Sequence, residues 1–141
     1  MIKDDLTLTG AVSIALNGQV VQEIPNLVVT AGKNWVASRM KDTTKAAMTH
    51  MAIGTNNTTA AVGQTSLSAE VARGALTSTT VSTNTIAYVE TFAAGTGTGA
   101  IVEAGVFNAS SGGTMLCRTV FAVVNKGSAD AMTIAWTITV S

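Results

Sequence analysis

The 141-residue sequence has little charge, few aromatic rings and few reactive side chains. Charged residues make up 11% of it and aromatic residues 4%, and it has one cysteine and one histidine. One cysteine excludes an intrachain disulfide framework and a cysteine-rich zinc site, and one histidine excludes every metal motif that needs two. The charged share is less than half the figure of about 25% that soluble domains usually show.

The few charges also balance, with eight basic and eight acidic residues. We therefore expect no nucleic-acid partner, because neutralising phosphates takes a basic surface. No apolar run reaches the roughly 18 residues of a membrane-spanning helix. The N-terminal MIKDDLTLTG has acids where an export signal has an apolar core. An apolar share of 47% is too high for an intrinsically disordered chain.

Small residues take the place of the missing charge. The chain contains 23 Thr, 22 Ala and 13 Gly, but one Pro. Soluble monomers usually carry more charge, and a net charge away from zero, to resist association. The composition therefore predicts a surface that neighbouring molecules cover. The length fits one domain over residues 1–141.

The periodicity is mostly that of β-strands. From Met132 to Val140 every second residue is apolar, with Thr or Ala between. Asn17-Gly18 between two strand-like runs is a strong hairpin signal, and Gly10 suggests a bend or bulge in the first run, residues 6–16. Further strands are expected over residues 19–24, 46–53, 71–82, 85–92, 101–107 and 115–124. Eight to ten short strands predict an all-β, antiparallel, jelly-roll-like sandwich.

One segment has helical spacing instead. Trp35, Val36, Arg39 and Met40 form one side of a short helix expected near residues 33–41. This helix could bind a partner or close an open end of the sandwich. A single helical turn is also expected over residues 66–71.

The only pair of residues suited to nucleophilic catalysis is Cys117 with His50, which could meet from distant positions. A cysteine inside an apolar strand is more often a buried packing residue. The stretch from Gly95 to Ala100 fits the letters of a dinucleotide-binding motif, but a strand follows it where that motif requires a helix. We expect no cofactor and no metal.

Two carboxylates offer a second catalytic arrangement. Glu90 and Glu103 lie on candidate strands on either side of the glycine-rich stretch. If those strands form a hairpin, the two could approach as glycosidase carboxylates do. Arg73 and Arg118 are available as ion-pair partners, however, and we expect the chain not to be an enzyme.

Residues 51–73, MAIGTNNTTAAVGQTSLSAEVAR, resemble a recurring segment of tailed-phage virion proteins. In that segment a strand ends at a glycine and runs into a Thr/Ala-rich loop. A Thr-x-Leu-x-x-Glu-[Val/Leu]-x-Arg turn then leads into a new strand. Here this turn runs from Thr65 through Leu67 and Glu70 to Arg73. The segment is moderately specific for phage structural proteins.

With its length, charge balance and strand pattern, the whole chain is similar to the capsid cement (decoration) proteins of tailed bacteriophages. The resemblance implies a jelly-roll sandwich that is made in the host cytoplasm and pairs as a homodimer on the capsid exterior. There it would bridge neighbouring copies of a major capsid protein with the HK97-like fold. Related cement proteins form trimers, so the symmetry stays open.

Candidate interface residues lie in an N-terminal arm, in the helix and in the Thr/Ala-rich loop. They are Met1, Ile2, Lys3, Asp4, Asp5, Trp35, Arg39, Asn56 and Asn57. The alternative function is a tail-fibre or baseplate module that binds a cell-surface glycan. It predicts an exposed aromatic cluster built from Trp35, Tyr88 or Trp136.

Overall fold

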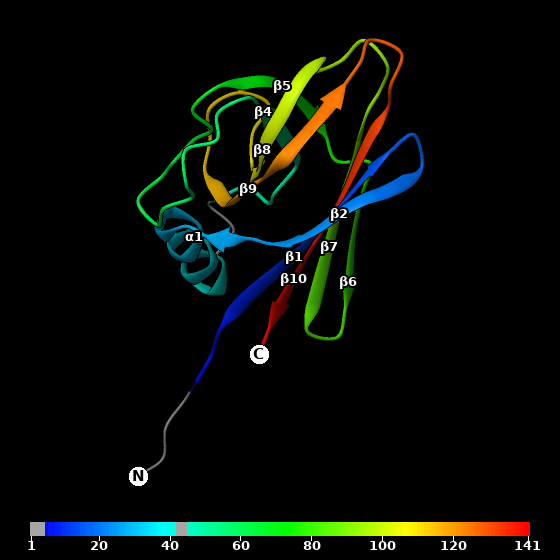
Figure 1. Cartoon of the computed structure of the whole chain (residues 1–141). Helices are drawn as coiled ribbons and strands as arrows, with labels where there is room; N and C mark the ends of the chain where they lie inside the picture. The colour runs from blue at the N-terminus through cyan, green and yellow to red at the C-terminus, as the bar shows by residue number, and fades with distance from the viewer. Residues whose placement is uncertain (1–4, 42–44) are drawn as a thin grey trace.

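Two antiparallel sheets of five strands each pack face to face in the computed structural model, which describes residues 5–41 and 45–141 (Figure 1). The elements are β1 (Leu8–Leu16), β2 (Gln19–Pro25), β3 (Leu27–Val28), α1 (Thr30–Lys41), β4 (His50–Gly54), β5 (Glu70–Ala75), β6 (Ser78–Ser82), β7 (Thr85–Phe92), β8 (Gly99–Phe107), β9 (Met115–Lys126) and β10 (Met132–Val140). The first sheet has the order β2-β1-β10-β7-β6, and the second β3-β9-β8-β4-β5. The predicted antiparallel sandwich is confirmed.

Strand β10 shows how the alternation in the sequence builds the core. Its buried side comprises Met132, Ile134, Trp136 and Ile138, and its half-exposed side Thr133, Ala135, Thr137 and Thr139. Successive strand side chains point to opposite sides of a sheet, so the apolar set meets the second sheet. There it joins one core cluster with residues such as Met51 and Val106. Each large apolar side chain buried in this way contributes about 1.5–3 kcal/mol.

Residues 71–82, expected as one strand, form parts of two strands in different sheets. β5 belongs to the second sheet and β6 to the first. The crossing takes place at Leu76 and Thr77. The Leu76 N–H donates to the Thr49 carbonyl, just before β4, at 2.9 Å, and the Thr77 N–H donates to the Val89 carbonyl in β7 at 2.7 Å. The alternation of polar residues continues through Leu76 and Thr77, so the sequence pattern does not show that the chain changes from one sheet to the other there.

Two smaller expectations are also corrected. No helical turn forms at residues 66–71, because β5 already begins at Glu70. Strand β1 pairs with β10 without interruption at Gly10, and the β1–β2 register shifts instead between Ile14 and Ala15. Gly10 is needed for another reason, since a Cβ there would overlap the side chain of Asn26. Asn26 lies where the chain crosses from β2 in the first sheet to β3 in the second.

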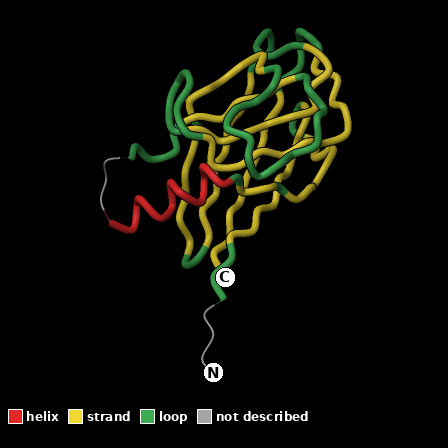
Figure 2. The backbone as a smooth tube through the Cα atoms, turned by 90° about the vertical axis from the view of Figure 1, so that its left-hand side faces the viewer, coloured by secondary structure: helices red, strands yellow, loops and turns green. Residues whose placement is uncertain are grey.

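Helix α1 starts at Thr30, three residues earlier than expected, and lies along one side of the sandwich (Figure 2). Trp35 and Val36 pack against the main core. Met40, on the same predicted side of the helix, is 81% exposed and does not join them in the core. The helix packs beside β9, where Gly32 leaves room for the backbone of Leu116.

The single tyrosine provides a test of the packed core. Burial, and secondly the charge of the Cys117 thiolate, raises the pKa of Tyr88 to about 12, against an ordinary value of about 10. Above pH 10 the unfolded chain therefore releases this proton first, and the free energy of unfolding is expected to fall between about pH 10 and pH 12. Spectrophotometric titration of tyrosinate in the folded protein measures the pKa directly. A midpoint near 10 would contradict the burial, and Tyr88→Phe controls for the ionisation of Cys117.

Candidate functional site

A buried ion pair joins β8 to β9 on the outer side of the second sheet. Glu103 and Arg118 both have fully buried side chains, with Oε1 of Glu103 3.1 Å from Nη2 and 3.2 Å from Nε of Arg118. Burying two charges costs more than their attraction returns unless further hydrogen bonds satisfy them. Those hydrogen bonds come from one loop.

The loop of residues 55–69, which we call the cover loop, is held against the second sheet by Glu103. Oε2 of Glu103 accepts from the backbone N–H of Asn56 at 3.0 Å and of Ala69 at 3.1 Å, and Oε1 accepts from the N–H of Ser68 at 3.3 Å. The carboxylate therefore fastens both ends of the cover loop at once. Gly54 leaves the space that this needs, because a Cβ there would lie 2.6 Å from Oε2.

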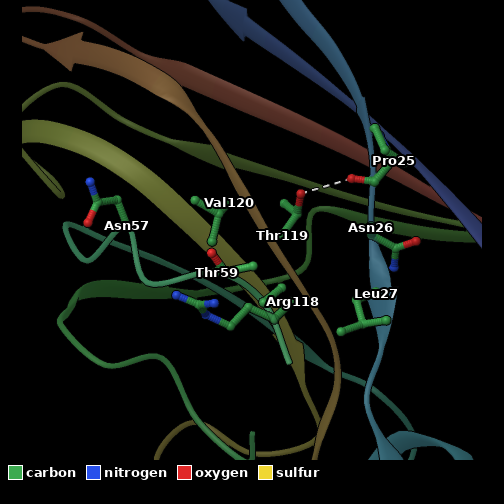
Figure 3. Close-up of a pocket in the computed structure, with 9 residues that line it drawn as sticks. Pro25, Asn26, Leu27, Asn57, Thr59, Arg118, Thr119 and Val120 are labelled. Atoms are coloured by element: carbon green, nitrogen blue, oxygen red, sulfur yellow. Dashed lines mark hydrogen bonds between the residues drawn. The ribbon is translucent and has the colours of Figure 1, made fainter. Parts of the chain in front are cut away.

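Arg118 fastens the middle of the cover loop. Its Nη1 donates to the Thr58 carbonyl at 2.8 Å and to Oε1 of Gln64 at 3.1 Å, and its Nη2 donates to the Asn56 carbonyl at 3.4 Å. The guanidinium points toward the loop that carries Asn57 and Thr59 (Figure 3). The arginine is thus fully engaged with the protein itself.

The Thr-x-Leu-x-x-Glu-Val-x-Arg turn completes the attachment of the cover loop. Leu67 is buried in a second apolar cluster that includes Phe107 and Met115. Glu70 and Arg73 form a two-pronged ion pair, with contacts of 2.7 and 3.0 Å. The Arg73 guanidinium lies 3.8 Å from the centroid of the Phe107 ring. The leucine, glutamate and arginine of this turn therefore all have structural roles.

The two candidate catalytic pairs do not form. His50 pairs in register with Phe107, and Cys117 with Val106, which places them on opposite sides of the second sheet. Cys117 is fully buried, and burial raises the pKa of its thiol. The cysteine is a packing residue.

Glu90 and Glu103 are separated as well. Their strands, β7 and β8, lie in different sheets and do not form the hairpin that a glycosidase arrangement requires. Glu90 points into the sandwich, where its Oε1 accepts from Thr77 Oγ1 at 3.1 Å and from the Thr91 N–H at 2.7 Å. Across the described residues, no group of three or more His, Cys, Asp or Glu side chains could hold a metal ion.

The structure describes five of the nine candidate interface residues and brings two of them together, since the Arg39 guanidinium lies over the Trp35 ring, 6.0 Å from its centroid. Met1, Ile2, Lys3 and Asp4 lie outside the described residues, and Asp5 is exposed. Trp35 is half-buried and donates through Nε1 to the Ala46 carbonyl at 2.8 Å, while Arg39 donates to the Lys45 carbonyl at 2.9 Å.

Asn56 and Asn57 belong to the cover loop. Asn56 is half-buried, and Asn57 is exposed. The aromatic cluster expected of a glycan-binding module is absent from the described surface, because Tyr88 and Trp136 are buried in the core.

A depression of about 360 Å³ lies between the cover loop and the crossing from β2 to β3 (Figure 3). Its wall comprises Pro25, Asn26, Leu27, Asn57, Thr59, Ala60, Arg118, Thr119 and Val120. Arg118 is its one charged residue and is already engaged, and the Thr119 hydroxyl donates to the Pro25 carbonyl at 2.9 Å. This hollow therefore offers a ligand neither a free charge nor a nucleophile.

The outer side of the first sheet is the most unusual surface, and only its β10 portion was foreseen. We call it the threonine face. It comprises Thr9, Ala11, Ser13, Ser78, Thr80, Ser82, Thr85, Ala87, Val89, Thr91, Thr133, Ala135, Thr137 and Thr139. Four adjacent strands contribute to it without one charged side chain, and Glu23 on β2 stands at its border. The alternation within each strand is visible in the sequence, but the order in which the strands pair is not.

Comparison with known proteins found no matching family model, curated protein or solved structure. In the described part of the chain, no helix is long and apolar enough to cross a membrane.

The ion pair under the cover loop is testable. Glu103→Ala leaves Arg118 as a buried charge without its carboxylate, and is expected to lower the free energy of unfolding by about 3–5 kcal/mol. Denaturant titration measures this loss. Hydrogen exchange at the Ser68 and Ala69 amides should also accelerate. The matched control is Glu70→Ala, whose pair with Arg73 is partly exposed, with an expected loss of about 0–1 kcal/mol. Equal losses for the two variants would contradict the role of Glu103.

Cys117 gives a second test. Because the thiol is fully buried and its pKa is raised, we expect a thiol reagent to modify the protein only as fast as it unfolds. In denaturant the same reagent should find one thiol per chain. Modification of the folded protein at the rate of a free cysteine would show that the side chain is accessible.

Proposed function

We propose that this chain is a structural virion protein, a cement protein that binds the outer surface of a phage capsid and stabilises it by bridging neighbouring major capsid proteins. The observation that carries the proposal is the threonine face. It is broad, and it lacks charge over four strands.

Such a face suits permanent contact with a neighbour. Thr, Ser and Ala cost less to desolvate than the Lys and Glu of an ordinary surface. Thr91 and Thr133 illustrate this, since their hydroxyl groups hydrogen-bond to each other at 2.9 Å. A depression of about 300 Å³ lies at the border of the face, between Ala11, Ala135 and Thr137 on one side and Glu23 on the other. Each contact is weak, but repetition over the capsid makes the total large.

The segment that resembles virion proteins fits the same role. The cover loop is held at both ends and in its middle, so its exposed residues, among them Thr55, Asn57 and Thr59, are presented on a fixed frame. The jelly-roll topology, the homodimer and the location on the capsid exterior are parts of this proposal that come from the resemblance.

The threonine face can be tested with one charge. Thr137→Lys places a lysine at the centre of the face, and it is expected to lower affinity for shells at least about tenfold, because a charge buried without a partner is costly. Co-sedimentation with shells purified from phage that lack this protein measures binding. The control is Ser128→Lys, which adds the same charge at an exposed residue of the turn between β9 and β10, away from both the threonine face and the cover loop. Unchanged binding by Thr137→Lys, or no binding by the unmodified protein, would overturn the proposal.

The copy number in the virion provides an independent test. A cement protein should approach the abundance of the major capsid protein, and particles that lack it should assemble but rupture at a lower temperature. Quantitative mass spectrometry and thermal release of DNA measure the two effects. A handful of copies per particle would point to the tail, where the alternative function belongs.

A further inference from the structure

The sandwich has four edge strands, and they differ in charge and length. β2 carries Glu23, β5 carries Glu70 and Arg73, and β3 has two residues. The fourth edge, β6, has the sequence STTVS. It is thus the only uncharged edge strand of useful length in the described structure, and it lies at the outer margin of the first sheet (Figure 1).

All five residues of β6 are exposed, and Val81 is 71% exposed. Natural edge strands are usually protected by charges, prolines, bulges or covering segments. β6 has no charge and no proline, and its register with β7 is regular; among residues 5–41 and 45–141, no other strand pairs with its free side. Val81 is thus an exposed apolar side chain on an edge that lacks these protections.

The backbone of β6 has hydrogen-bonding groups to offer. Thr83 and Asn84 form a two-residue turn between β6 and β7, so Ser82 and Thr85, which flank it, are a hydrogen-bonded pair. Such pairs alternate along an antiparallel ladder. The N–H and C=O groups of Thr79 and Val81 are therefore directed at the free edge.

We infer that β6 pairs antiparallel with β6 of a second copy of this chain. The two-fold axis of this dimer passes between the Thr80 residues of the two copies. In this register Thr79 of each copy lies opposite Val81 of the other, and Thr80 lies opposite its own counterpart. The outward groups of Thr79 and Val81 then form about four backbone hydrogen bonds between the copies.

The absence of charge favours a second copy as the occupant. A two-fold axis places a side chain beside the axis opposite its own copy, so a charged side chain there would face a like charge. STTVS opposes serine to serine, threonine to threonine and threonine to valine. The strand beside it, β7, adds no charge to the outer side, since its Glu90 points into the core.

Pairing through β6 would also join the threonine faces of the two copies. A two-fold axis normal to the sheet keeps both outer sides facing the same way, so the dimer presents one continuous sheet of ten strands whose eight central strands form an uncharged outer face. Two joined faces bind a repeating shell more tightly than one. This consequence rests on the proposed function, whereas the β6 contact itself is argued from the edge alone.

A charge-swap at Thr80 tests the axis in purified protein, apart from any capsid. The unmodified chain is expected to sediment as a dimer. Thr80→Lys and Thr80→Glu each place like charges opposite each other, and each should weaken the dimer at least about tenfold. An equimolar mixture of the two variants should restore a dimer that contains one copy of each, measured by analytical ultracentrifugation and native mass spectrometry.

Two controls separate the interface from general effects of charge. Thr9→Lys adds the same lysine to the same outer side of the first sheet, on the inner strand β1, and Val20→Lys adds one to the other edge of that sheet, at a valine that is 59% exposed. Both variants should stay dimeric. A monomeric unmodified chain, a dimer that survives Thr80→Lys, or a mixture that stays monomeric would overturn the β6 contact. None of these outcomes would alter the shell-binding test of Thr137→Lys, so the two proposals can fail separately.

Discussion

The buried pair of Glu103 and Arg118 organises one whole side of the molecule. It lies on the outer side of the second sheet, where without a covering segment two charges would sit beside water and the apolar cluster around Phe107 would be bare. The cover loop satisfies the pair and shields the cluster at once. Its own backbone, poor in regular hydrogen bonds, finds its partners in these two side chains. Loop, sheet and ion pair therefore depend on one another.

The structure shows which parts of the surface lack charged side chains. Among the charged side chains that the structure describes, four are buried, namely Glu90, Glu103, Arg118 and Lys126. The surface is therefore even less charged than the composition suggests, and the deficit is concentrated on the threonine face and on strand β6. An uncharged face and an unprotected edge are hazards for a monomer. For a protein that tiles a larger assembly they are binding surfaces, and this contrast links the proposed function to the proposed dimer.

Sequence patterns succeeded where a single strand or turn carried the information. The alternation of 132–140 predicted which side of β10 is buried, and Asn17-Gly18 predicted the β1–β2 hairpin, whose turn has positive φ at both residues. They failed where the answer depended on a distant partner. The run 71–82 changes sheet because residues near positions 49 and 89 accept its hydrogen bonds. Lys126 lies beyond the strand expected over residues 115–124, yet β9 extends to it, and it is buried with its Nζ donating to the Ala93 carbonyl at 2.9 Å.

By itself, then, the sequence determined the class of fold and the lack of charge, because period-two alternation and composition are local properties of the chain. Arg118 was recognisable as an available partner for a carboxylate, but only the tertiary structure decided that Glu103 takes it and that both hold the cover loop. Likewise, Thr and Ala at alternate positions were visible in each strand, yet the order in which strands pair turned four separate stripes into one uncharged face. Strand order is set by the packing of the two sheets around a shared core, and no local pattern encodes it.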